Sequence, residues 1–350
     1  MKSSKTLLIL YSEVMPYNMA CFQQLVNLFN IEIHLIQWKT QKLTPYVAED
    51  LPGIVTYDRE SLSRDQLFSL AKDVNPDLIF VSGWMDRGYL RLCEYFKKRG
   101  VIVLCGLDNQ WDSSLKQYLI SLFRKRYVHK YFTHSFVPGI RQYEYARNIG
   151  FKPDCITLGA YTANTSLFNK PRLKNKINKK ILFVGRFNKV KGIDILINSF
   201  TSVIREHKEL EDWELILIGN GPEKDNYIQS TNIKVLDFMS QEDVLKVVED
   251  VDFFCLASRK EPWGVVIHEM AAAGLPLILS DTTGAGTEYL IDGYNGFQFK
   301  NQSESELREN LLKLMSSSLK ELNIMGERSY KMSLNNSPEI WAYKVNRLLN

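Results

Sequence analysis

Short apolar runs of strand length alternate with longer amphipathic stretches along almost the whole chain, and this alternation limits the folds open to it. Runs such as Ile181–Val184 and Leu215–Ile218 consist mainly of Ile, Leu and Val, as expected for strands that are buried on both faces of a parallel sheet. The stretches between the runs have the length and periodicity of helices. The pattern therefore predicts an α/β fold built from β-α-β units.

The first half of the chain contains enough alternating segments for one complete doubly wound domain. We expect its strands near Thr6–Leu10, Glu32–Gln37, Leu78–Val81, Val101–Cys105 and Tyr131–Thr133. We expect its helices at Met19–Phe29, Asp65–Lys72, Tyr89–Arg99, Ser113–His129 and Ile140–Ile149.

A polar and basic stretch, Asn169–Lys180, interrupts the alternation and has the composition of an interdomain linker. After it the pattern restarts. We expect strands at Ile181–Val184, Glu214–Ile218, Ile233–Leu236, Phe253–Ala257 and Pro276–Ser280. We expect helices at Ile193–Glu206, Glu223–Gln229, Gln241–Val248 and Val265–Ala273. Because 350 residues are too many for one ordinary core, we predict two Rossmann-like domains with a cleft at the carboxyl ends of their strands.

Composition narrows the class of protein. Hydrophobic residues make up 45% and charged residues 24%, as in soluble globular proteins, and no apolar run approaches the ~20 residues that span a bilayer. Met1–Tyr11 imitates a signal peptide, but we interpret it as the first buried strand. The five cysteines have no metal-ligand spacing, so we expect reduced packing residues in a cytoplasmic protein. A net charge of +4 is too weak to indicate a nucleic-acid partner.

The segment Glu261-Pro-Trp-Gly-Val-Val-Ile-His-Glu269 follows a predicted strand and opens a predicted helix. Amides around Gly264 and Val265 would then lie at a helix N-terminus, where phosphate can bind. Glu261 would face the cleft, and Glu269 could project toward a ribose, since a carboxylate accepts hydrogen bonds from two neighbouring hydroxyls. On spacing alone, acidic residues in the first turns of an ordinary helix explain the segment equally well.

This segment resembles the signature E-P-F-G-x-x-x-x-E of glycosyltransferase family 4 (glycosyl transferases group 1), retaining enzymes of the GT-B fold, with Trp263 where Phe is usual. Gly185-Arg186-Phe187 followed by Lys191-Gly192 is similar to the family's G-R-x-x-x-x-K-G. The resemblance implies that Arg186 and Lys191 neutralise the diphosphate of a nucleotide sugar. Two solvated cations in a loop are the alternative.

Two further stretches resemble parts of the family's donor pocket. Gly219-Asn220-Gly221-Pro222 is similar to its G-x-G-P turn, and Val235–Ser240 is similar to the F-x-G-x-V-S stretch that receives the nucleobase. Asp237 stands at the usual glycine position of the second stretch. Phe238 and Met239 are therefore either base contacts or plain core residues. The donor-binding residues implied by the resemblance are Arg186, Lys191, Gly219, Asn220, Phe238, Met239, Glu261, Trp263, Gly264, Val265 and Glu269.

The first half departs from the family. Ser12–Met19 has no glycine where many members carry a glycine-rich loop, and Gly106–Trp111 stands where a histidine is often found. We therefore expect Asp108 and Asn109 nearest the reacting carbon, Asp108 in a catalytic role with Glu261, Arg186 and Lys191. A capping and turn cluster before the next helix is the alternative. The acceptor-side candidates are Glu13, Tyr17, Trp84, Asp86, Asn109 and Trp111, the last of which, like Trp84, could equally be core.

The resemblance implies transfer of a sugar from a UDP- or GDP-sugar to a glycan or lipid-linked acceptor in bacterial polysaccharide or glycolipid synthesis. It implies no protein nucleophile, and we expect neither cofactor nor metal, because we identify no D-x-D motif of the kind that carries a divalent ion. Asp250-Val251-Asp252 has the D-x-D spacing but leads directly into the predicted strand at Phe253. It also implies domains at 1–170 and 171–335, with 336–350 returning to the first domain through Trp341, Tyr343, Val345 and Leu348. A nucleotide-sugar epimerase or a non-catalytic scaffolding subunit of the same fold are the alternatives.

The segment Leu115–Tyr131 places Leu115, Leu119, Leu122 and Phe123 at helical spacing among five cations. Such a basic amphipathic helix could rest on the anionic inner face of the cell membrane, near a lipid-linked acceptor. Packing of the apolar stripe into the core, with solvated cations around it, is the alternative.

Overall fold

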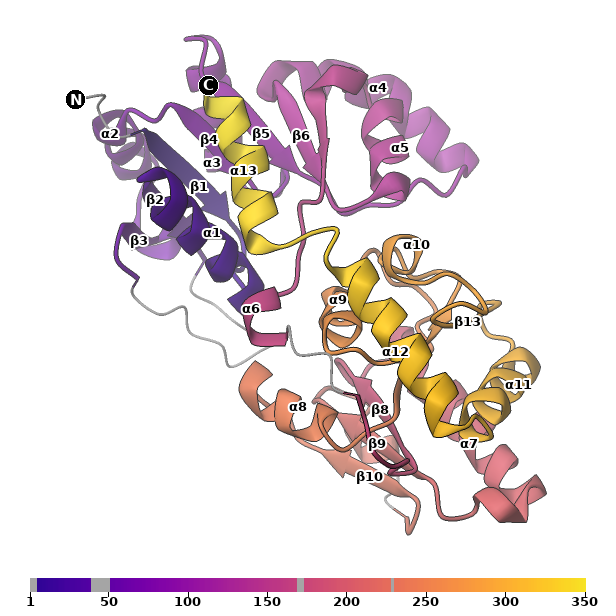
Figure 1. Ribbon diagram of the computed structural model, residues 1–350. Helices are drawn as coiled ribbons and strands as arrows, with labels where there is room; N and C mark the ends of the chain where they lie inside the picture. The colour runs from indigo at the N-terminus through magenta and orange to yellow at the C-terminus, as the bar shows by residue number, and fades with distance from the viewer. Residues whose placement is uncertain (1–4, 39–50, 169–172, 228–229) are drawn as a thin grey trace. The chain divides into compact units, whose positions relative to one another are not determined.

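The computed structural model describes residues 5–38, 51–168, 173–227 and 230–350. The chain divides into two compact units, the first formed by residues 1–164 and 336–350 and the second by residues 165–335 (Figure 1). Each unit is a parallel sheet flanked by helices, as the alternating pattern predicts. Within the described ranges, no helix combines the length and apolarity needed to cross a membrane.

The sheet of the first unit has the strand order β3-β2-β1-β4-β5-β6-β7, and all of its strand pairs are parallel. The order reverses beside β1, so the switch point of this sheet lies between β1 and β4. Both strands are almost entirely buried because helices cover both faces. The strands are β1 (Thr6–Tyr11), β2 (Glu32–Gln37), β3 (Ile54–Asp58), β4 (Leu78–Val81), β5 (Ile102–Gly106), β6 (His134–Val137) and β7 (Ile156–Leu158).

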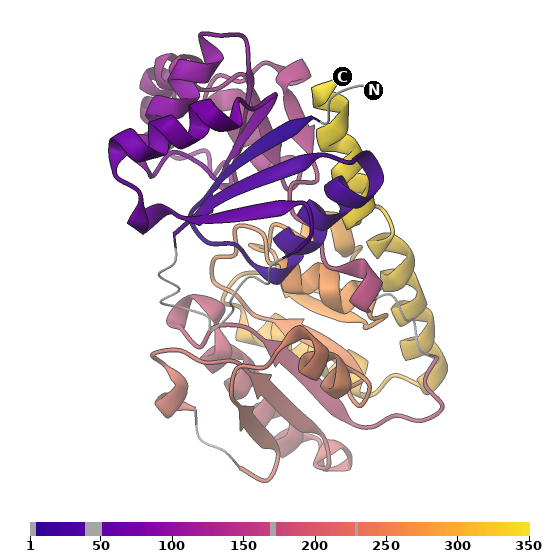
Figure 2. The ribbon, with the colours of Figure 1, turned by 90° about the vertical axis from the view of Figure 1, so that its left-hand side faces the viewer.

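Two apolar cores hold the helices of the first unit to the two faces of its sheet. One core joins α1 (Pro16–Phe29) and α13 (Pro338–Leu349) to the sheet. Figure 2 shows these two helices side by side. The other contains residues of α2 (Arg64–Val74), α3 (Arg87–Lys97), α4 (Leu115–Tyr131) and α5 (Ile140–Asn148). These helices therefore fix the strand ends of the first unit.

The last helix, α13, is part of the first unit although it follows the second in sequence. Trp341 is buried among aromatic rings, and its indole donates a hydrogen bond to the carbonyl of Ala160 at 3.0 Å. Val345 is buried as well, whereas Tyr343 is exposed and meets only the edge of Phe29. Tyr343 therefore lies at the solvent-exposed border of the packing face that the sequence predicts for this helix.

The sheet of the second unit has the order β10-β9-β8-β11-β12-β13, again parallel, with its switch point between β8 and β11. Its strands are β8 (Lys180–Val184), β9 (Glu214–Ile218), β10 (Ile233–Leu236), β11 (Phe253–Leu256), β12 (Leu277–Ser280) and β13 (Gly296–Phe299). Its helices are α6 (Thr165–Phe168), α7 (Ile193–Glu206), α8 (Gln241–Val248), α9 (Val265–Ala272), α10 (Gly286–Tyr289), α11 (Glu304–Met315) and α12 (Leu319–Ser333). Helix α7 packs with α11, and α9 packs with α12.

Two expected elements are wrong. The strand expected at Tyr131–Thr133 is absent because α4 continues to Tyr131 and β6 begins only at His134. In place of the helix expected at 223–229, the described residues form only a short 3-10 turn, Lys224–Asn226, and residues 228–229 lie outside the described part. Of the expected linker, residues 169–172 also lie outside it, and 173–179 form neither helix nor strand.

Candidate functional site

Two loops meet at the switch point of the second sheet, one after β8 and one after β11. The loop after β8 ends in a 3-10 turn, Lys189–Lys191, and the loop after β11 contains Glu261. The ammonium of Lys191 forms an ion pair with the carboxylate oxygen Oε2 of Glu261. Ser258 donates a hydrogen bond to the same oxygen at 3.2 Å. A lysine and a glutamate 70 positions apart in sequence are thus held together at the carboxyl ends of β8 and β11.

The position of Lys191 is set by its own loop. The side chain of Asn188 accepts a hydrogen bond from the backbone amide of Lys191 at 3.2 Å. Gly192 follows with a φ of +64°, and a Cβ there would lie 2.0 Å from the carbonyl oxygen of Ala257. Because only glycine fits so close to the β11 loop, the sequence Lys191-Gly192 brings the cation to that loop.

Arg259 holds the Lys189–Lys191 turn from the side of β11. Its guanidinium makes a bidentate ion pair with Asp194, at 2.8 and 2.7 Å, and donates to the carbonyl of Lys189 at 2.7 Å. The paired guanidinium keeps the pKa of Asp194 below its usual value. Sequence reasoning missed Arg259 and Asp194, because no spacing rule joins residues whose contact depends on the pairing of β8 with β11. It also missed Ser258, since a serine three residues before a glutamate is not a specific signal.

Backbone hydrogen bonds attach the Glu261 segment to the residues that follow β12. Gly284 donates to the carbonyl of Glu261 at 3.0 Å, and Ala285 donates to the carbonyl of Trp263 at 2.9 Å. The Trp263 side chain is only 3% exposed and meets the edge of Tyr289. The indole is thus buried against Tyr289, and the expected donor contact of Trp263 stays a prediction.

Helix α9 begins at Val265, directly after Gly264, which has a φ of +88° and provides no side-chain cap. A Cβ at Gly264 would lie 3.0 Å from Cγ of Glu261, so glycine lets the helix start beside that side chain. An uncapped helix N-terminus presents amide donors and a partial positive charge. The amides expected to bind phosphate thus lie next to Glu261.

Glu269, on α9, accepts a hydrogen bond from the side-chain amide of Gln241 at 2.6 Å. Gln241 is the first residue of α8, so the contact joins the N-terminal part of α8 to α9. Burial raises the pKa of Glu269 to about 7, although this hydrogen bond opposes the shift. Gln241 was not expected from the sequence.

His268, the neighbour of Glu269, is structural. It is fully buried, its Nε2 lies 2.9 Å from the carbonyl of Ser333, and its ring stacks on Tyr289 at 4.2 Å. Burial lowers its pKa to about 4. The imidazole is therefore neutral near pH 7 and donates to the carbonyl of α12.

The loops after β8 and β9 are in direct contact. A Cβ at Gly219 would lie 1.9 Å from the carbonyl oxygen of Gly185, and Phe187 donates to the carbonyl of Asn220 at 2.8 Å. Arg186 is half-buried between these anchors, and its guanidinium forms no ion pair or hydrogen bond within the described part of the chain. The exposed Asn220 accepts from the amide of Gly221 at 2.8 Å.

The stretch between β10 and α8 is open to solvent. Phe238 is exposed and Met239 is half-buried, so core packing does not explain Phe238. Asp237, at the position where the family has glycine, forms an ion pair with Lys224. Ser240 then caps α8 by accepting from the amide of Asp243 at 3.2 Å.

Comparison with known proteins identifies this half of the chain. The model of the family described as "Glycosyl transferases group 1" matches residues 165–332. The second unit belongs to the group 1 glycosyltransferases. Spore coat protein SA of Bacillus subtilis is 32% identical over 158 residues, which is 41% of this chain and 41% of that protein. The chain thus spans about two fifths of the length of the curated relatives it matches, such as this one with 41% covered.

Solved structures match both units. Anabaena HepE in complex with UDP and glucose has a TM-score of 0.72 at 13% identity, covering 99% of each chain. Sucrose-phosphate synthase from Thermosynechococcus elongatus has a TM-score of 0.74 at 17% identity, covering 99% of this chain and 98% of that one. The fold of this chain is therefore GT-B, with two Rossmann-like domains.

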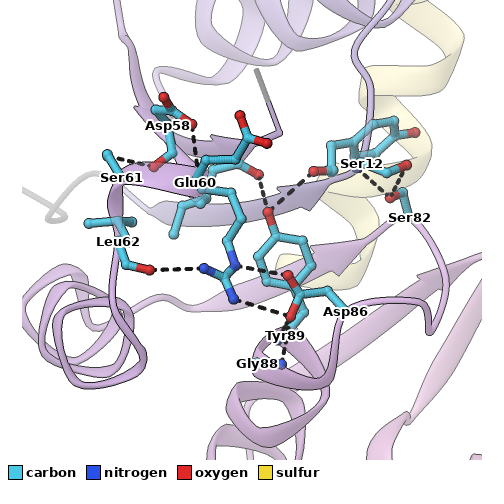
Figure 3. Close-up of polar contacts among 12 residues, drawn as sticks. Ser12, Asp58, Glu60, Ser61, Leu62, Ser82, Asp86, Gly88 and Tyr89 are labelled. Atoms are coloured by element: carbon cyan, nitrogen blue, oxygen red, sulfur yellow. Dashed lines mark hydrogen bonds and ion pairs between the residues drawn. The ribbon is translucent and has the colours of Figure 1, made fainter. Parts of the chain in front are cut away.

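The first domain of this GT-B chain has a different cluster at its own switch point, shown in Figure 3. After β1, the amide of Ser12 donates to Oγ of Ser82 at 3.0 Å, which joins the loops after β1 and β4. Asp86 caps α3 by accepting from the amides of Gly88 and Tyr89 at 2.6 and 3.2 Å. Nε of Arg59 lies 2.8 Å from the same carboxylate.

Among the other expected acceptor-side residues, Asp108 and Asn109 are exposed. They do not cap α4, because Ser114 does so by accepting from the amide of Gln117 at 3.2 Å. The alternative reading of Asp108 and Asn109 as helix caps is therefore wrong. Each of the remaining aromatic candidates packs against a neighbour in its own domain: Trp84 against Arg124 and Phe132, Trp111 against Tyr118 and Tyr145, and Tyr17 against Tyr161, while Glu13 is half-buried.

Proposed function

We propose that this protein transfers a sugar from a nucleoside-diphosphate donor, with retention of anomeric configuration, to a glycan or lipid-linked acceptor. The observation that carries the proposal is the Lys191–Glu261 pair at the switch point, directly beside the uncapped N-terminus of α9. A cation and helix amides bind a diphosphate, whereas a carboxylate binds sugar hydroxyls. The match of residues 165–332 to the group 1 glycosyltransferases supports this assignment.

In this proposal Lys191 and Arg186 stabilise the negative charge that develops on the departing diphosphate. The Arg186 guanidinium has no partner among the described residues, so a phosphate would be its first strong ligand. Lys191 is paired with Glu261 in the unliganded protein, and this pairing keeps its ammonium at the carboxyl ends of the strands. When the diphosphate binds, Lys191 turns to it and Glu261 is released to accept the donor sugar's hydroxyls.

Glu269 and Phe238 are the proposed contacts for the nucleoside. Glu269 is oriented by Gln241 and accepts hydrogen bonds from the ribose hydroxyls. The exposed ring of Phe238, with Met239 beside it, packs on the base. HepE, which shares the fold, was solved with UDP and glucose, which supports a uridine donor.

The acceptor is proposed to bind through the first domain, with Asp108 and Asn109 nearest the reacting carbon because both are exposed and uncommitted to helix capping. Charge on the diphosphate is balanced by side chains and amides, so we propose neither metal nor organic cofactor. A bacterial polysaccharide or glycolipid pathway and a cytoplasmic location, peripheral at the inner membrane face, complete the proposal.

Thermal-shift measurement against a panel of UDP- and GDP-sugars tests the donor. A true donor at 100 times its Kd stabilises the protein by about 2.7 kcal/mol, and the corresponding free sugar leaves the melting temperature unchanged. Incubating that donor with glycan and lipid-linked acceptors, followed by proton NMR of the product, then tests transfer and retention. A changed donor sugar without a new glycosidic bond would contradict the proposal in favour of an epimerase.

A further inference from the structure

Helix α4 presents its apolar side chains to solvent. Leu115 is 83% exposed, Leu119 62%, Leu122 67% and Phe123 80%, and Tyr118 is 52% exposed. These five residues, called here the α4 outer face, follow the spacing i, i+3, i+4, i+7 and i+8, so they lie along one side of the helix. The alternative in which this stripe packs into the core is therefore wrong.

The opposite side of α4 is fixed to the first domain. Val128 and Ser121 are buried, and the guanidinium of Arg124 stacks over Trp84 at 4.5 Å. At the end of the helix, Lys97 donates to the carbonyl of Phe132 at 2.8 Å. These contacts set the orientation of the α4 outer face, because a rotation of α4 about its own axis would break them.

Basic side chains accompany the α4 outer face on the solvent side. Lys116, Lys125 and Arg126 are exposed, and none forms an ion pair with any described residue. Lys130 is the only α4 cation with such a partner, Glu94 at 3.3 Å, among the described residues. The helix itself contains no acidic residue. An apolar face and unpaired positive charge therefore point in the same direction.

We propose that the α4 outer face docks on an anionic lipid surface. Leucine and phenylalanine side chains enter the boundary between headgroups and acyl chains, while Lys116, Lys125 and Arg126 pair with lipid phosphates. A second copy of this chain fits the surface less well. A two-fold contact through the same face would bring these cations against their own copies, and like charges oppose association. This inference rests on the peripheral membrane location included in the proposed function and names its surface, but it does not depend on the proposed sugar transfer.

Flotation of the full chain with vesicles tests the inference. We expect binding to vesicles of phosphatidylcholine containing phosphatidylglycerol, and weak binding to phosphatidylcholine alone. High salt should release the protein from the anionic vesicles, because exposed cations contribute on the order of fivefold in affinity each. Equal binding to both vesicle types, or no binding to either, would overturn the proposal.

Two variants locate the surface. Leu119→Ser/Leu122→Ser/Phe123→Ser should abolish flotation, whereas Lys125→Glu/Arg126→Glu should lower affinity by on the order of tenfold or more. Leu28→Ser and Lys152→Glu, which change exposed residues elsewhere in the first domain, are the matched controls and should bind as the natural protein does. Because the substituted side chains are exposed, circular dichroism and nucleotide-induced thermal shifts should be unchanged in every variant.

Two results would contradict the lipid assignment. Undiminished flotation of the triple Ser variant would show that another surface binds lipid. Sedimentation equilibrium could also reveal a dimer of the natural chain that the triple Ser variant loses, and this result, with no flotation, would assign the face to a second copy. Loss of the nucleotide-induced thermal shift in all variants and controls would instead concern the donor site, so the two proposals fail separately.

Discussion

The two sheets of the molecule have the same kind of switch point but use it differently. Beyond β8 and β11, the half-buried Lys191 and the buried Glu261 and Ser258 form a polar cluster, and close-packed glycines hold its loops. Beyond β1 and β4, the charged groups are committed to structure, because Asp86 caps α3 and pairs with Arg59. Both switch points pair a cation with a carboxylate, but in the first unit that carboxylate also caps α3, whereas in the second it lies beside the N-terminus of α9.

This difference explains where the sequence match lies. A diphosphate site such as the one proposed needs cations, free amides and glycines at fixed points, which would account for the match of residues 165–332 to the group 1 glycosyltransferases. An acceptor is recognised by a few side chains on loops, which can change without disturbing the sheet. The resemblance in the first domain is correspondingly confined to its fold.

Replacing Lys191 gives the largest expected effect. Lys191→Ala should raise the barrier to transfer by about 2 to 4 kcal/mol, because the leaving diphosphate loses a fixed cation. Lys189→Ala, an exposed lysine on the same turn, is the control and should retain nearly full activity. Steady-state kinetics with a saturating donor measures both. Equal, small effects of the two changes would mean that the charged cluster has no special role at the second switch point.

A methyl group at Gly219 tests the loop contact next. In Gly219→Ala the Cβ would lie 1.9 Å from the carbonyl oxygen of Gly185, so the loops must separate, at a cost of about 1 to 3 kcal/mol. Gly293→Ala provides the control, since Gly293 also has a positive φ, of +71°, but has open space around its Cβ. Donor affinity should fall only in Gly219→Ala. An unchanged Kd of Gly219→Ala for the donor would show that the close contact of Gly219 with Gly185 does not shape the donor site.

The residues that meet at the second switch point could be singled out from the sequence because each is tied to a local signal. Glu261 and Glu269 are fixed by their spacing on one loop and helix, and Lys191 by the adjoining Gly192. Ser258 was missed because a serine three residues before a glutamate is not a specific signal. Gln241 and Arg259 were missed because each acts through a partner on another element. Their contacts follow from the strand order, which the linear pattern leaves open.

The other features that could not be predicted from the sequence also depend on contacts between elements. The sequence marks Trp263 as part of the motif but does not show that Tyr289 buries its ring. It shows the apolar stripe of α4 but not the side to which that stripe turns. Strands β3, β7 and β13 escaped prediction because they are short strands with partly exposed side chains, which weakens the apolar signal.

At the first switch point, Asp86 separates scaffolding from acceptor binding. Asp86→Ala should destabilise the first domain by about 1 to 2 kcal/mol, since α3 loses its cap and Arg59 its partner. Asp86→Asn keeps an acceptor for the cap and should cost less. Chemical denaturation measures both. If Asp86 only supports the fold, the acceptor KM stays constant well below the melting temperature, whereas a raised KM in both variants would place Asp86 at the acceptor.

The smallest expected effect concerns pH, through Glu269. Its pKa in the free protein is about 7, against an ordinary value of 4.5, because burial disfavours the ionised form. Ribose hydroxyls donate to the ionised form, so nucleotide affinity should rise as pH increases from 6 to 8, by at most about tenfold per unit below the pKa. Binding below pH 7 should also release protons, which calorimetry in buffers of different ionisation enthalpy detects.

Folding stability gives an independent measure of the same carboxyl group. Because the pKa of Glu269 is raised in the folded protein, its contribution to the free energy of unfolding is complete below about pH 4.5 and is lost as pH rises through 7. His268, with a pKa lowered to about 4 from 6.5, acts oppositely, since its contribution is lost as pH falls from 6.5 toward 4. The two oppose each other between 4.5 and 6.5, so Glu269 is isolated above pH 6.5. Above pH 6.5, Glu269→Gln should flatten both the decline of folding stability with pH and the pH dependence of nucleotide binding. If the variant flattened only the stability curve, Glu269 would not contact the nucleotide.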